Sequence, residues 1–208
     1  MTLPTIEIPQ PDLPSPLPTE HQALMNVFYD YWQALSAKVR ENNAALCEGC
    51  NELWVNPQIE GMLRSPNQAE IAAVMPPKVN AAVILGNMHY QIGNGGWAQY
   101  DDNGYSESID AARALYEGGV SVGVENADKV VAIIDEFRKR KGEADKPGGY
   151  YGYDEDDESQ DDGDIYDDLD TRYYAIDGEP LMQDILDRFE EITSYSFLAG
   201  AYTKRKAA

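Results

Sequence analysis

The sequence predicts an all-α protein: a single irregular bundle of about six to eight helices, with a Pro-rich N-terminal arm and an acidic loop before the last helix. Three observations predict this class. Apolar residues recur at helical spacing, sustained strand-type alternation is absent, and glycine, proline and asparagine mark short connections. With 208 residues and 43% hydrophobic content, the chain is long enough to bury a substantial core.

Residues 1–18 are predicted to form an extended arm, because six prolines fall within them and proline does not fit a helix interior or an inner strand. Residues 19–203 are expected to form the helical domain. Thr19 predicts an N-cap, and Gln22 three residues later completes a capping box. Apolar residues then follow at helical spacing, which predicts one long amphipathic helix over residues 20–46.

The other expected helices share helical spacing of apolar residues and end near glycine or proline, and they cover residues 51–57, 68–75, 77–92, 97–102, 109–117, 126–141 and 181–197. Ser106 and Ser108 compete as N-cap of the helix through Tyr116, which Gly118-Gly119 is expected to end. The basic residues 138–141 are interpreted as complementing the negative pole of their helix.

The net charge of −21 belongs to the whole molecule. Residues 154–170 contain 11 acids and no base, yet the rest of the chain still carries 26 acids against 16 bases. Such a field repels nucleic acid and anionic lipid and attracts basic protein surfaces, so neither direct nucleic-acid binding nor membrane association is expected. Plain solubility is the competing explanation for the charge.

A cytoplasmic location is expected, because the sequence has neither an apolar run of 18 residues nor a signal-peptide pattern. Cys47 and Cys50 are interpreted as two ordinary thiols on one helical turn. A zinc site would need two further ligands, and only His21 and His89 are present, neither at finger spacing. No metal and no cofactor are therefore expected.

The acidic run 154–170 has three interpretations. As a nucleic-acid mimic, it must hold carboxylates at spacings near those of phosphates. Tyrosines in and around the run would fix it by burying their rings with the hydroxyls outward: Tyr150, Tyr151, Tyr153, Tyr166, Tyr173 and Tyr174. The second interpretation is a disordered, solubilising loop. The third, a calcium loop, fails because Leu169 falls where a bidentate acid belongs.

Adjacent glycines interrupt the helical pattern in QIGNGGWAQY, residues 91–100, at a cost of about 1 kcal/mol each relative to alanine. The favoured interpretation is a tight link in which Gly95 or Gly96 takes positive φ and Asn94 caps the next helix. A phosphate-binding glycine loop is disfavoured, because no Lys or Ser/Thr follows at P-loop spacing.

A family resemblance is carried by an ordered set of segments: Asn94-Gly95-Gly96, Gln99-Tyr100, Asn103, 109–115, 127–134 and 168–174. Over about residues 75–195 the chain resembles the bacterial DNA mimic protein 19 family. The resemblance implies an all-helical, non-enzymatic fold in which the fold-defining residues are Asn94, Gly95, Gly96, Gln99 and Tyr100. One characterised member type carries negative side chains arranged like duplex phosphates and occupies the DNA-binding face of a helix-turn-helix repressor.

The predicted function is an acidic DNA mimic that blocks the nucleic-acid-binding surface of a basic protein, such as a transcription repressor, a nuclease, or a CRISPR or restriction effector. A homodimer would match the two-fold symmetry of a dimeric DNA binder. The acids predicted to mimic phosphates are those of the run, Asp154, Glu155, Asp156, Asp157, Glu158, Asp161, Asp162, Asp164, Asp167, Asp168 and Asp170, and those of a second row, Asp101, Asp102, Glu107 and Asp110.

Two other function classes stay open. A small hydrolase or metal-dependent enzyme would have a cleft near Asn94-Gly95-Gly96, lined by His89, Gln99, Tyr100 and acids. An acidic interaction or immunity protein with incidental charge would instead bind through an apolar patch and be indifferent to salt.

Overall fold

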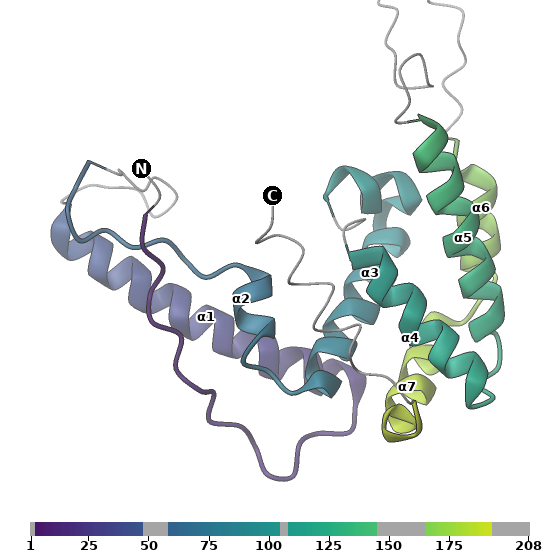
Figure 1. The fold of residues 1–208 in the computed structure, drawn as a ribbon, viewed down its shortest axis with the longest axis horizontal. Helices are drawn as coiled ribbons and strands as arrows, with labels where there is room; N and C mark the ends of the chain where they lie inside the picture. Colours follow the sequence, from purple (N-terminus) through teal and green to yellow (C-terminus); the bar gives the residue numbers. More distant parts are fainter. Residues whose placement is uncertain (1–2, 48–57, 105–107, 145–164, 193–208) are drawn as a thin grey trace, which may run out of the picture. The chain divides into compact units, whose positions relative to one another are not determined.

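The computed structural model describes residues 3–47, 58–104, 108–144 and 165–192, and within these ranges it contains helices and no β-strand (Figure 1). The predicted all-α class is confirmed. The helices are α1 (His21–Leu46), α2 (Gln68–Ala72), α3 (Pro77–Asp102), α4 (Ile109–Ser121), α5 (Ala127–Ala144), α6 (Asp167–Tyr174) and α7 (Gly178–Asp187), followed by the 3-10 helix η2 (Phe189–Glu191). No helix in the described ranges has the length and apolar character needed to cross a bilayer.

The chain divides into two compact units between Val83 and Ile84, inside α3. In the first unit the described part of the Pro-rich arm contains no helix and is fastened at several points. Thr5 forms an isolated parallel bridge with Arg64, whose N–H donates to the Pro4 carbonyl at 3.0 Å. The Tyr31 hydroxyl of α1 donates to the Pro9 carbonyl. These bonds satisfy backbone groups of a segment that cannot join a helix.

Helix α1 has the length predicted, and it buries the expected apolar stripe through Leu24, Phe28 and Leu35. The predicted capping box is wrong: Glu20 is the N-cap, and the Gln22 amide donates to the Asn26 side chain at 3.0 Å. Because Gln22 lies in the first turn, an i,i+4 partner within the helix competes with the cap.

The end of α1 corrects a second expectation. Cys47 lies just beyond the helix in extended conformation and is disulfide-bonded, whereas an ordinary thiol was predicted there. Its neighbour Cys50, like the expected helical turn 51–57, lies outside the described residues.

Several helices of the second unit differ from expectation. Helix α4 continues through Gly118-Gly119 to Ser121, since these glycines allow close packing: a Cβ on Gly118 would lie 2.5 Å from Ile192 Cγ2. The acidic residues from Asp167 onward form α6, which was not predicted as a helix. Helix α7 begins three residues early and ends at Asp187, because the chain tightens into η2 there.

Buried aromatic rings form the core of the second unit, where α5 packs against α4 and α6 (Figure 1). The rings of Trp97 and Phe137 lie 4.6 Å apart, and Tyr166 lies 5.0 Å from Phe137. Tyr173 meets Trp97 edge-on at 5.9 Å. As predicted, Tyr166 and Tyr173 bury their rings, although the Tyr166 hydroxyl is also buried rather than outward. Tyr174 is 55% exposed.

Glu70 closes a capping box at the start of α2. Its N–H donates to Asn67 Oδ1 and its carboxylate accepts from the Asn67 N–H, each at 2.9 Å. Arg64 donates to both carboxylate oxygens at 2.6 and 2.7 Å. The Arg64 hydrogen bonds lower the pKa of Glu70 from 4.5 to about 2.

We expect Glu70→Gln to lower the free energy of unfolding at neutral pH by about 1–2 kcal/mol, the size of a lost charge-assisted bond partly screened by solvent. Because the folded pKa is depressed, this contribution is complete above pH 4.5 and is lost as the pH falls through about 2. Urea unfolding of both proteins at several pH values measures the difference. A constant difference down to pH 2 would contradict the assignment.

Candidate partner-binding surface and pocket

The Asn-Gly-Gly stretch lies in a kink of α3. Gly95 (φ −160°, ψ 27°) and Gly96 (φ 75°, ψ −172°) leave the helical conformation, and the helix resumes at Trp97. The positive φ at Gly96 was predicted. The predicted cap, Asn94, is replaced by a distant residue: the Trp97 N–H donates to Asp170 Oδ1 of α6 at 2.8 Å, although the two residues are 73 positions apart.

Polar side chains bridge the kink on its other side. The side-chain oxygen Oε1 of Gln91 accepts from the Gln99 side-chain amide and from the Asn103 side-chain amide, both at 2.8 Å. A Cβ on Gly95 would collide with the Gln99 side chain, so the glycine leaves room for this bridge. Tyr100 is fully buried, with its hydroxyl 3.3 Å from the Ser108 hydroxyl. The motif residues therefore meet at one structural feature, the bend of α3.

Asp170, predicted to mimic a phosphate, has a structural role at this bend. A Cβ on Gly96 would collide with the Asp170 carboxylate, so the absence of a side chain at Gly96 allows the acid to reach the Trp97 N–H. A carboxylate at a helix N-terminus is favoured by unpaired N–H groups and by the helix dipole. Asp170 thus fastens α6 to the second segment of α3.

The basic cluster of α5 pairs with three more of the predicted acids. Arg138 lies 2.9 Å from Asp110, and Lys141 lies 2.7 Å from Asp101. Arg140 donates to Asp168 and thereby lowers the pKa of that carboxyl. The cluster, interpreted from sequence as complementing its own helix, instead joins α5 to three neighbouring segments.

Two of the predicted acids have the exposed carboxylates that a partner-binding surface requires. Asp102 and Asp167 are exposed and form no ion pair with another residue of the described chain. The other predicted contacts lie outside the described residues, namely Glu107 and the eight acids from Asp154 to Asp164.

The segment from Asp177 to Glu191 is an acidic surface that the sequence analysis missed. It carries six acids and one base, and all seven side chains are exposed. Asp184 and Glu191 form no ion pair with other described residues. The available sequence signal was the position of these acids between the apolar residues of α7, but it is weaker than the dense acidic run 154–170. We call this segment the α7 acidic surface.

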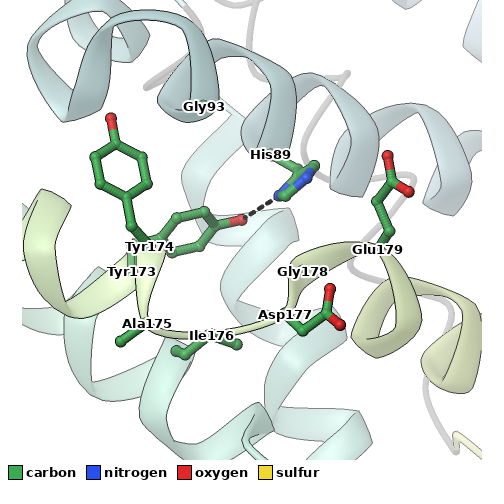
Figure 2. Close-up of a pocket in the computed structure, with 9 residues that line it drawn as sticks. All are labelled: His89, Gly93, Tyr173, Tyr174, Ala175, Ile176, Asp177, Gly178 and Glu179. Atoms are coloured by element: carbon green, nitrogen blue, oxygen red, sulfur yellow. Dashed lines mark hydrogen bonds between the residues drawn. The ribbon is translucent and has the colours of Figure 1, made fainter.

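A pocket of about 540 Å³ lies within the second unit, between α3 and the α6–α7 junction (Figure 2). It is lined by His89 and Gly93 of α3 and by residues 173–179. Figure 2 shows the Tyr173 hydroxyl pointing toward His89, whose Nδ1 lies 3.3 Å away. A Cβ on Gly178 would collide with the imidazole, so this glycine permits the close approach.

Burial governs the titration of His89. It disfavours the imidazolium and lowers the pKa of His89, while the charges of Glu179 and Asp177 act in the opposite direction. Burial also raises the pKa of Tyr173. The pocket therefore combines a neutral imidazole, a neutral phenol and two carboxylates at neutral pH.

The enzyme alternative predicted a different set of residues. His89 and acids line the pocket, but Gln99 and Tyr100 belong to the kink. The lining contains no Ser, Thr, Cys or Lys to act as a nucleophile. In the part of the chain that the structure describes, no three His, Cys, Asp or Glu side chains are grouped to hold a metal ion.

These features define an acidic, all-helical protein built around a bent helix. Residues 73–193 match the family model described as DMP19-like protein, more than half of the chain, and the chain belongs to this family. The family is a non-enzymatic one of the DNA-mimic type, as the sequence resemblance implied. Neither a search of curated proteins nor a search of solved structures finds a match.

Two glycine substitutions, one in the kink and one in the regular part of α3, test the role of the kink. We expect Gly96→Ala to lower the free energy of unfolding by about 2–4 kcal/mol, because alanine disfavours this backbone conformation and its methyl group displaces Asp170. Gly93→Ala, in the helical and open part of α3, should be neutral or stabilise by up to about 1 kcal/mol. Denaturant unfolding measures both, and equal effects would contradict the role of Gly96.

Asp101 and Asp102 are adjacent in the sequence, but in the described structure only Asp101 forms an ion pair. The Asp101 side chain is 9% exposed beside Lys141, so Asp101→Asn should destabilise by about 1–2 kcal/mol. The same change at exposed Asp102 should stay within about 0.5 kcal/mol. Thermal unfolding at constant ionic strength compares the two variants, and a larger loss at Asp102 would refute the assignment.

Proposed function

We propose that this protein is a DNA mimic that binds the nucleic-acid-binding surface of a basic protein and blocks it. One observation carries the proposal. In the described part of the second unit, 18 acids accompany 8 bases, and each base has a partner within the unit. The unpaired charge left at the surface is therefore negative, as a basic partner requires.

Helical geometry gives these charges fixed positions. Residues three or four apart on a helix have Cβ atoms about 5–6 Å apart, and B-DNA carries one phosphate per about 3.4 Å of axis on each strand. Within the α7 acidic surface, Asp184 and Asp187 lie three residues apart in α7 and thus have a charge spacing of the same order as a nucleic-acid strand. Because the helices are held by the aromatic core, binding does not require ordering them first.

The charge pattern supports a partner with a basic, nucleic-acid-binding face. A transcription repressor, a nuclease, or a CRISPR or restriction effector each presents a basic, nucleic-acid-binding face. For a dimeric partner, a homodimer of this protein would present two acidic faces related by a two-fold axis. The acids of residues 154–164, which lie outside the described residues, are also proposed to contact the basic partner.

The proposal is tested by capture with the tagged full-length chain at about 50 mM salt, followed by competition. The captured protein should bind nucleic acid, be released by duplex DNA, and lose more than tenfold in affinity between about 50 and 200 mM salt, because the contacts replace those of phosphates. Retention at 200 mM salt or indifference to duplex DNA would contradict the proposal.

A matched pair of variants locates the surface. The surface variant neutralises four unpaired acids of the second unit: Asp102→Asn, Asp167→Asn, Asp184→Asn and Glu191→Gln. The control variant makes the same charge change at exposed acids of the first unit: Glu20→Gln, Asp30→Asn, Glu41→Gln and Glu60→Gln. We expect the surface variant to lose at least about tenfold more affinity for the captured protein than the control, since steering charge alone would affect both equally.

A further inference from the structure

We infer that the pocket between α3 and the α6–α7 junction binds the side chain of an arginine presented by the basic partner. This inference rests on the proposed function and assigns a specific anchor to it. The pocket holds about 540 Å³, ample for a guanidinium group, and its lining includes neither lysine nor arginine. An arriving cation therefore meets no competing positive charge inside it.

Two carboxylates favour a cation in this pocket. Asp177 and Glu179 are exposed and form no ion pair with any other residue in the described ranges. Asp177 is the N-cap of α7, yet its side chain makes no capping hydrogen bond, so both of its oxygens remain available. The N–H groups at the start of α7 would by themselves attract an anion, but these two carboxylates oppose it.

The aromatic lining favours arginine over lysine. The Tyr174 ring is 55% exposed, and its hydroxyl is fixed by donation to the Ile92 carbonyl at 2.8 Å. Figure 2 shows this ring and that of Tyr173 on the α6 side of the pocket, with Asp177 and Glu179 following in the chain. A planar guanidinium stacks on a tyrosine ring and forms paired hydrogen bonds with carboxylates, whereas an ammonium acts as a compact point charge.

His89 makes the pocket compatible with this occupant. A charged imidazole would repel a guanidinium, but burial keeps His89 neutral at physiological pH, and its Nδ1 lies against the Tyr173 hydroxyl. A metal ion is a poorer occupant, because no group of three suitable ligands is present among the described residues.

The test uses small probes with the full-length protein. Nα-acetyl-arginine amide, Nα-acetyl-lysine amide and Nα-acetyl-citrulline amide are titrated at constant ionic strength while amide resonances are followed by NMR. We expect saturable shifts at Gly93, Gly178 and Tyr174 with the arginine probe, weaker binding of the lysine probe, and no saturable shift with the citrulline probe, which is nearly isosteric but uncharged. Equal responses to all three probes would overturn the inference.

Variants provide the second readout. Asp177→Asn with Glu179→Gln should weaken binding of the arginine probe at least about tenfold. Asp184→Asn with Glu191→Gln makes the same charge change on the α7 acidic surface outside the pocket, and should leave probe binding within about twofold. If both double variants weaken binding of the arginine probe equally, the attraction comes from the overall negative charge, and the inference of an arginine pocket is overturned.

The two proposals fail separately. If the arginine probe does not bind but a partner is still captured and released by duplex DNA, the inference of an arginine pocket is wrong and the proposed mimic function stands. If the arginine probe binds specifically but no captured partner is displaced by duplex DNA, the guanidinium site is supported and the proposed mimic function is refuted.

Discussion

The bond from the Trp97 N–H to the Asp170 carboxylate is the contact on which the second unit depends. It restarts α3 after the kink, and it requires a residue without a side chain at Gly96. By fastening α6 it also brings Tyr173 into the aromatic core and places the α6–α7 junction against α3. One acid thus helps to assemble both the core and the pocket, so a carboxylate of the acidic run has a structural role within the unit.

The acids in the described part of the second unit divide into two groups according to whether a base lies beside them. Asp101, Asp110 and Asp168 face the basic end of α5 and are neutralised there. Residues such as Asp102 and Asp184 have no ion-pair partner in the described ranges and contribute fully to the external field. Because each base in the described part of the second unit has a partner within the unit and acids outnumber bases there, the negative field is a consequence of how this part is built.

The sequence predicted the helical class, the long first helix and the positive φ at the glycine pair, because each follows from local chemistry: spacing of apolar residues or the freedom of glycine. It did not reveal the partner of the Trp97 N–H, since a contact across 73 positions leaves no local pattern. The continuation of α4 through Gly118-Gly119 was missed for a related reason: packing against Ile192 outweighed the tendency of glycine to end a helix.

A purely electrostatic surface and an anchoring pocket would have different effects on binding. Distributed carboxylates act over about a Debye length, so they accelerate encounter and lose their effect as salt rises. They discriminate poorly among basic proteins, all of which present positive charge. A pocket that stacks a guanidinium and pairs it with Asp177 and Glu179 acts only at contact, and therefore fixes the register of the partner and slows dissociation. Since many basic proteins compete for a negative surface, selectivity requires such a short-range site, and the pocket at the α6–α7 junction is the one proposed for that role.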